Sequence, residues 1–189
     1  MTVRSARHDN RRDVLSRAIT SGGAVSPPAA LVGLVALATA VDGLLAGASL
    51  DQSIKQLPAR HRIGVVAFSE YSRASDLANG VLWYAGLGIG GAGVTIAAAV
   101  GALVLGVSDR QRLPLLLAGL LAIGHSFATA RAAPINLGQR SAAGDEAALK
   151  HSFDRFERWQ TARAILQLAT FLVMLWALAS AAAASSRSD

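Results

Sequence analysis

The 189-residue sequence contains no cysteine and has few charged residues. The missing cysteine excludes disulfides, thiolate nucleophiles, cysteine-ligated zinc and iron–sulfur clusters. Charged residues make up only 16% of the chain, whereas they make up about 25% of soluble domains. Hydrophobic residues account for 52%, and 18 glycines add to them. This composition excludes a disordered chain and argues against an ordinary soluble enzyme.

The basic residues outnumber the acidic ones by 18 to 12, which gives a formal net charge of +6. Several arginines are clustered ahead of the first apolar run, at Arg4, Arg7, Arg11, Arg12 and Arg17. A basic tail in this position commonly sets membrane topology or contacts anionic lipid. We therefore expect this basic tail to contact membrane lipid and not nucleic acid.

Four apolar runs are each long enough to cross a hydrocarbon core of about 30 Å, which takes about 20 helical residues. Such runs form helices because hydrocarbon offers no water to the backbone amides. The predicted fold is all-α, an integral membrane four-helix bundle with amphipathic helical segments outside the membrane. We expect a basic, mostly disordered tail at 1–28, a transmembrane domain at 29–184 with spans at about 29–50, 77–107, 113–131 and 160–184, and a C-terminal tail at 185–189.

The segments between the spans indicate the topology. The short turn at 108–112 carries two arginines, and the N-terminal tail is basic, so we expect both termini on the cytoplasmic side of the cell membrane. Segments 63–77 and 145–159 have partly helical spacing of apolar residues. We expect them to extend the second and fourth spans on the outer side.

Polar residues inside the predicted spans fall at a similar depth on four helices. Such residues are costly in a membrane and are functional candidates. At 1.5 Å per residue most of them lie about 9–12 Å below the outer surface, and Arg163 lies about one turn nearer to that surface. They are Asp42, Tyr84, His125, Arg163 and Gln167. Because Asp42 is the one carboxylate inside a span, we expect it to pair with Arg163, and the group either fixes helix register or lines a pocket open to the outer leaflet.

His125 has two main interpretations. It is either a hydrogen-bonded structural residue or a general acid or base with a pKa close to neutral. A metal site would need companions such as His61 and His151 from the outer segments. The sequence has no HxxxH or ExxH spacing, so we predict neither a metal nor a cofactor.

The second span contains a run that matches GxGxxG, at residues 88–93. A nucleotide site would need a strand before this run and a helix opening at it, whereas the run lies inside a long uncharged segment. Small residues at helical spacing instead predict close helix packing, through Gly86, Gly90 and Gly93. We expect this glycine stripe to pack within the bundle or to join two copies of the chain.

The end of the third run and the start of the fourth carry a recognisable pattern. Pro134 and Asn136 form a P-x-N motif, and Trp159 and Arg163 form a W-x-x-x-R motif. This arrangement resembles the anthrone oxygenase-like family of small four-helix integral membrane proteins, most of which have no assigned function.

Further similarity to that family lies at the end of the first run. Gly43 and Gly47 are followed by Leu57-Pro58, so the resemblance extends over about residues 30–182. The characterised branch of the family oxidises anthrones to anthraquinones without a cofactor. The resemblance therefore implies an oxygenase-like activity, and it marks Asn136 as well as the two residues of the W-x-x-x-R motif.

The residues themselves allow such chemistry. A deprotonated phenolic substrate can reduce dioxygen without a cofactor. The protein must then supply a base, which is His125 or Asp42, and a cation to stabilise the anion, which is Arg163 or Arg131. Asn136 would supply an amide donor, and the pocket must be dry.

The predicted function is binding of a small lipophilic or aromatic molecule at the outer end of the bundle, with its oxidation as the implied reaction. The candidate catalytic residues are His125, Asp42 and Arg163. The candidate substrate-binding residues are Asn136, Trp159, Tyr84, Gln167 and Arg131. Two alternatives stay open, a non-enzymatic scaffold or interaction subunit and a small proton-coupled carrier, so the sequence leaves undecided whether the protein is an enzyme.

Overall fold

The computed structural model describes residues 28–185, and these residues are almost entirely helical. The elements are α2 (Ala29–Asp51), the π-helical η1 (Gln52–Gln56), α3 (Leu57–Ile63), α4 (Val65–Ala74), the π-helical η2 (Ser75–Asn79), α5 (Gly80–Val104), α6 (Asp109–Gly138) and α7 (Glu146–Ser185). The all-α prediction is thus confirmed for this part of the chain. The predicted tails lie outside the described residues, except for Pro28 and Ser185.

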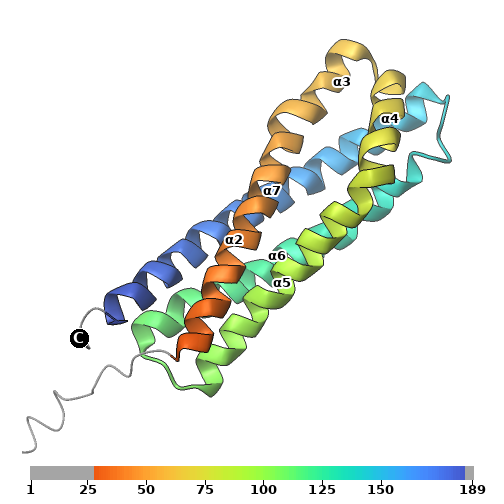
Figure 1. The fold of residues 1–189 in the computed structure, drawn as a ribbon. Helices are drawn as coiled ribbons and strands as arrows, with labels where there is room; N and C mark the ends of the chain where they lie inside the picture. Colours follow the sequence, from red (N-terminus) through yellow and green to blue (C-terminus); the bar gives the residue numbers. More distant parts are fainter. Residues whose placement is uncertain (1–27, 186–189) are drawn as a thin grey trace, which may run out of the picture.

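Four helices are long and apolar enough to cross a membrane. They are Ala29–Ile63, Gly80–Val104, Asp109–Gly138 and Glu146–Ala184, with mean hydropathy between 1.7 and 2.1 in their apolar windows. The four run side by side, and the start of α2, the α5–α6 turn and the end of α7 lie at one end (Figure 1). We call this end the inner end and the opposite end, where α3 and α4 lie, the outer end.

The outer end is built by helical extensions rather than open loops. The chain turns between α3 and α4 at Gly64, whose φ of 85° favours glycine. α4 and η2 then lead directly into α5. α7 begins outside its apolar part and runs on without a break for 40 residues. Helical structure at 63–77 and 145–159 is therefore as the sequence predicts, and the P-x-N motif lies inside α6, because this helix continues to Gly138.

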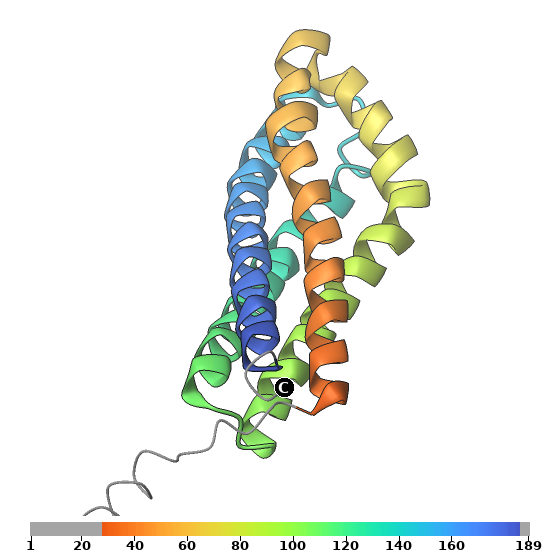
Figure 2. The same ribbon diagram turned by 60° about the vertical axis from the view of Figure 1, so that its left-hand side comes forward.

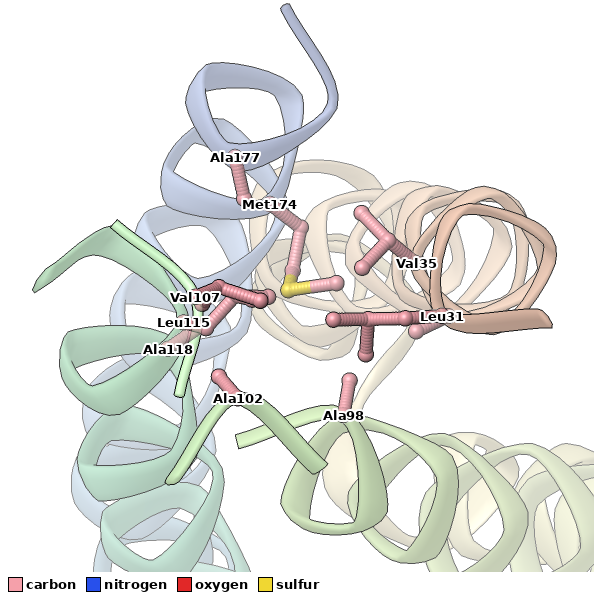
Figure 3. Close-up of a cluster of buried hydrophobic side chains, with 10 residues drawn as sticks. Leu31, Val35, Ala98, Ala102, Val107, Leu115, Ala118, Met174 and Ala177 are labelled. Atoms are coloured by element: carbon pink, nitrogen blue, oxygen red, sulfur yellow. The ribbon is translucent and has the colours of Figure 1, made fainter. Parts of the chain in front are cut away.

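The inner half of the bundle has a mainly apolar core, with Thr39 and Gln111 buried beside it. Figure 3 shows the Met174 side chain of α7 pointing into the space between α2 and α5. Leu31 and Val35 of α2 and Ala98 of α5 surround it. Many members of this cluster are alanines, so the helices pack closely there.

The outer end has a second apolar cluster, which is aromatic. It is formed by Leu57, Phe68, Ala132, Leu149, Phe153 and Phe156. The rings of Phe68 and Phe153 meet edge to face with centroids 5.0 Å apart. This contact fastens α4 to the start of α7, so it closes the outer end of the bundle.

The outer half of α5 packs differently from the rest of the bundle. No residue in the range 80–90 is buried, whereas burial resumes at Gly91 and Ala92. Figure 2 shows the α4–α5 side of the molecule leaning away from α7 toward the outer end. The outer half of α5 is therefore attached to the bundle mainly where it continues from η2 and where burial resumes at Gly91.

The predicted glycine stripe faces outward. A Cβ atom built at Gly86, Gly90 or Gly93 would meet no atom within 4 Å. The interpretation in which this stripe packs within the bundle is therefore wrong. The α5 glycines that α2 does contact closely are Gly91 and Gly101, which lie outside this stripe.

Candidate functional site

The interior is polar between the inner apolar cluster and the outer aromatic cluster. Buried polar side chains from α2, η1, α6 and α7 meet at this level, namely Ser49, Gln52, His125, Gln160 and Gln167. α2 and α7 are joined here by two hydrogen bonds. Ser49 donates to the Gln167 side chain, and Gln160 donates to the Ser49 carbonyl at 3.3 Å.

Arg163 of α7 lies in this polar layer. Its Nη2 donates to Gln52 Oε1 at 3.0 Å. Gln52 in turn donates from Nε2 to Asp76 Oδ2 at 3.4 Å. The π-helical segments η1 and η2 supply Gln52 and Asp76, so these two irregular segments connect Arg163 to a carboxylate at the outer end.

The same hydrogen-bond chain continues to α6. Ser72 donates to Asp76 Oδ2 at 3.0 Å, and Ser72 Oγ accepts from Gln139 Nε2 at 3.2 Å. Gln139 also donates to Asn136 Oδ1 at 2.9 Å. Asn136 and Arg163, two positions marked by the family resemblance, are thus the two ends of one chain of polar side chains.

Asp76 lies outside the apolar part of the bundle but is itself buried. Burial raises the pKa of its carboxyl group above the ordinary 3.8. Hydrogen bonds from Ser72, Ser75 and Gln52 and the charge of Arg163 act in the opposite direction, and their combined effect is smaller. Asp76 therefore holds its proton to a higher pH than an exposed carboxyl group does.

The predicted ion pair between Asp42 and Arg163 is wrong. Gly43 faces the Phe171 ring, which places Asp42 level with Phe171. Eight helical residues, about 12 Å, separate that level from Arg163. Asp42 Oδ2 instead accepts a hydrogen bond from Thr95 of α5 at 2.7 Å. The antiparallel register of α2 and α7 therefore separates the two charged groups.

His125 is fully enclosed, with 1% of its surface exposed. Neither ring nitrogen has a hydrogen-bond partner among the described residues. The ring lies close enough to Arg163 for the two groups to interact electrostatically. A buried polar group without a partner costs about 1–3 kcal/mol, so this imidazole is the least satisfied polar group at this level.

The other predicted site residues divide into two groups. Tyr84 is half-buried and is close enough to Arg163 and Asp76 for electrostatic interaction. Trp159 and Arg131 instead gather around Phe127, an exposed ring of α6. The Trp159 ring meets it edge to face at 6.1 Å, and the Arg131 guanidinium lies 5.1 Å from its centroid. The structure therefore places Trp159 and Arg131 on the flank of the bundle, apart from the hydrogen-bond chain.

Sequence reasoning missed the residues that connect the chain, namely Gln52, Ser72, Asp76, Gln139 and Gln160. They lie in segments that we expected to be outer connections, or beside a residue already chosen. One signal was available, because Ser69, Ser72 and Asp76 follow each other at helical spacing. Ser69 donates to Gln139 Oε1 at 3.0 Å, so this stripe faces α6.

The described residues contain no group of three or more His, Asp or Glu side chains placed to hold a metal ion. A small cavity of about 10 Å³, enough for one water molecule, lies among Leu31, Leu115 and Ala177 at the inner end. It lies within the inner apolar cluster, and His125 does not line it. The polar layer thus offers hydrogen-bonding groups and one cation, without a metal cluster formed by these residues.

No family model, curated protein or solved structure matches this chain. The resemblance to the anthrone oxygenase-like family therefore stays a prediction that depends on its short motifs. Chemically, the described site combines an unpartnered imidazole, a guanidinium and a nearby phenol. This set can bind an oxygen-containing group and exchange a proton with it.

Proposed function

We propose that the protein is a multi-pass integral membrane protein of the cell membrane with both termini in the cytoplasm. The support is the apolar outer surface of the four long helices. Ile89, Leu120, Ile123, Ile165 and Leu172 are all more than half exposed. An apolar surface of this extent needs a lipid or protein covering, and the basic residues near the inner turn favour the cytoplasm on that side.

Within that protein, the polar layer binds a small lipophilic or aromatic molecule and supports its oxidation. The observation that carries this proposal is the enclosed His125 ring, whose two nitrogens find no partner in the part of the chain that the structure describes. A purely structural histidine would be expected to find a partner. A ligand oxygen at this position would satisfy the ring, and the absence of buried residues over 80–90 in α5 allows that helix to move aside for entry from the lipid.

The oxidation uses dioxygen and needs no further reductant. One anthrone and one dioxygen give one anthraquinone and one water. His125 takes a proton from the acidic carbon of the substrate, and the resulting anion transfers electrons to dioxygen. A carbon–oxygen bond forms, and the oxygen–oxygen bond then breaks as the remaining hydrogen on that carbon leaves, so that one oxygen atom stays in the product and the other becomes water.

Binding is tested by native mass spectrometry of protein purified from its own membrane. We expect a co-purified small molecule on the wild type and its loss from His125→Ala. Ser126→Ala is the matched control, because Ser126 is the next residue and its hydroxyl donates to the Ala122 carbonyl of its own helix at 2.8 Å. Equal retention by both variants would contradict a role for His125 in binding.

Oxidation is tested with anthrone in lipid nanodiscs, by following dioxygen consumption and anthraquinone formation together. We expect equal amounts of the two and a loss of at least about a hundredfold in His125→Ala, which is the low end of what a general base contributes. Empty nanodiscs measure the uncatalysed reaction. A wild-type rate equal to that of empty nanodiscs would reduce the proposal to ligand binding.

A scaffold role is the second candidate, and it is favoured by one observation. The Gly86, Gly90 and Gly93 face is open, so a helix of a second copy or of another protein can approach it closely. Native mass spectrometry on the same sample reports this directly. A dimer that dissociates when Gly90 is replaced by Leu would support the scaffold role.

A further inference from the structure

Among the described residues, the side chains of Arg60 and Arg163 reach into the interior, and only the charge of Arg60 is balanced by ion pairs. Arg60, 6% exposed, lies 2.9 Å from Asp154 and 2.5 Å from Glu157, so two carboxylates balance its charge. Arg163 forms no ion pair with any described residue. Within residues 28–185, its one hydrogen-bond partner is the neutral amide oxygen of Gln52.

The arginine also has unused bonding capacity. Its Nε–H is buried and has no hydrogen-bond partner among the described residues. This atom lies on the same guanidinium that interacts electrostatically with the His125 ring. A neutral imidazole always carries one N–H donor. Two buried donors from α6 and α7 are therefore available at one level, and one of them belongs to a cation.

No carboxylate of the described residues forms an ion pair with this guanidinium, although Asp76 is near enough to interact with it electrostatically. Asp76 already accepts hydrogen bonds from Ser72, Ser75 and Gln52, and it lies on the far side of Gln52 from the guanidinium. Asp42 is about 12 Å away along the bundle. A negatively charged group from outside the chain would complete the site.

We propose that the ligand of this site is bound as an anion, with its charged oxygen accepting hydrogen bonds from Arg163 Nε and from the His125 ring. The chemical class is a lipophilic oxyacid, such as a fatty or aromatic carboxylate, an enolate or a phenolate. This inference rests on the proposed ligand-binding function and adds the charge of the ligand to it. Hydrogen bonds to a charged group are about twice as strong as neutral ones, so the charge gives specificity.

The test uses two probes with the same ring system and different charge. These are 9-anthracenecarboxylate and 9-anthracenemethanol, measured by energy transfer from the tryptophans of the protein in nanodiscs of neutral lipid. We expect the carboxylate to bind the wild type at least about tenfold more tightly than the alcohol, as the difference between charged and neutral hydrogen bonds predicts.

Three variants test whether the charge of Arg163 causes the preference for the carboxylate probe. Arg163→Gln should bind both probes with affinities within about threefold of each other, whereas Arg163→Lys should retain most of the preference for the carboxylate. Arg155→Gln is the control, because it removes the same charge from an exposed position of the same helix. Thermal unfolding of each variant shows whether it is folded, and the lysine variant keeps the test valid if the glutamine variant unfolds.

The possible results separate the two proposals. Saturable binding of both probes with equal affinity overturns the anionic ligand and leaves the lipophilic ligand site standing. A carboxylate preference that persists in Arg163→Gln also overturns it, because the charge of Arg163 is then not the cause. Saturable binding of neither probe to the wild type overturns this inference and the proposed aromatic-ligand site together.

Discussion

Gly91 is the point at which α5 approaches the buried carboxylate of α2. A Cβ atom at this position would lie 3.1 Å from Asp42 Oδ1 and 3.3 Å from a methyl group of Val41. Gly93, two residues further along, has open space at its Cβ position. Gly91 therefore allows α5 to pack closely against α2, whereas Gly93 lies on an open face. The sequence pattern alone does not distinguish the two glycines.

Gly91→Val should destabilise the protein by about 1–3 kcal/mol, the usual cost of overpacking, because the new methyl groups must displace Asp42 or Val41. Gly93→Val is the matched control and should change stability little. Thermal unfolding in the same detergent measures both. Equal losses in the two variants would show that helix propensity, and not the contact with Asp42, decides the effect.

Asp76 gives the outer end a dependence on pH. Its pKa is raised by burial, so the folded protein keeps this proton where the unfolded chain has lost it. The stabilisation from Asp76 is fully present below pH 3.8 and is lost as the pH rises through the raised pKa.

Replacing Asp76 with Asn removes the carboxyl group whose protonation causes this dependence on pH. The unfolding temperature of Asp76→Asn, relative to the wild type, should therefore rise as the pH is raised from 4 to 8. Glu70→Gln removes a carboxyl group from an exposed position of α4 and is the control for the loss of one acidic residue. A difference between Asp76→Asn and the wild type that is independent of pH would mean that the pKa of Asp76 is the same in the folded and unfolded chains.

At the scale of elements, the two π-helical segments are the unexpected feature. A π turn widens the helix and is frequent at functional sites. η1 and η2 follow α2 and α4 at the same level of the bundle and face each other through the Gln52–Asp76 hydrogen bond. The widened turns thus direct these two side chains inward from segments that would otherwise be simple outer connections.

The pairing between helices can be measured with double-mutant cycles. Asp42→Ala and Thr95→Val should be non-additive, because the two side chains share a hydrogen bond of 2.7 Å between α2 and α5. Asp42→Ala and Arg163→Gln should be additive within about 0.5 kcal/mol, as expected for separated sites. Strong coupling between Asp42→Ala and Arg163→Gln would contradict the structure and favour an ion pair between Asp42 and Arg163.

At the scale of the whole molecule, the bundle is an apolar core, a polar layer and an aromatic cluster in succession. The inner cluster around Met174 and the outer cluster around Phe153 both hold helices together without polar groups. The polar layer between them carries His125 and Arg163. Such an arrangement places apolar clusters on both sides of the candidate site along the bundle, while the half of α5 without buried residues lies beside it.

The proposed topology is tested by cysteine labelling, since the chain has no native cysteine. Ser108 precedes α6 and Ser141 follows it, so single cysteines at these positions should react from opposite sides of the membrane. We expect Ser108→Cys to be labelled from the cytoplasmic side. Labelling of both from one side would mean that α6 does not cross the membrane.

Several features could be predicted from local sequence. Four apolar runs gave four long helices, and the amphipathic spacing at 145–159 correctly indicated a helical start for α7. The W-x-x-x-R motif pointed to Arg163, which does lie in the polar layer. These features depend on residues close together in the chain, where the period of a helix and the cost of an unpaired backbone fix the result.

Pairing across helices could not be predicted in the same way. Depth along each helix suggested that Asp42 meets Arg163, but that estimate ignores relative register and rotation. The structure pairs Asp42 with Thr95 and connects Arg163 through Gln52 to Asp76. The partners Gln52 and Asp76 lie in π-helical turns, whose widening no apolar pattern reports.

The sequence by itself determined that the described chain is helical and that four of its helices can cross a membrane, because length and hydropathy are local properties. Tertiary structure alone decided which polar groups meet, which glycine packs against Asp42 and which faces of α5 stay open. The physical reason is that one residue of axial shift moves a side chain by about 1.5 Å and turns it by about a quarter of the helix circumference. Contacts between helices therefore follow from the packing of the whole bundle, and so does the unpartnered state of His125 and Arg163 Nε.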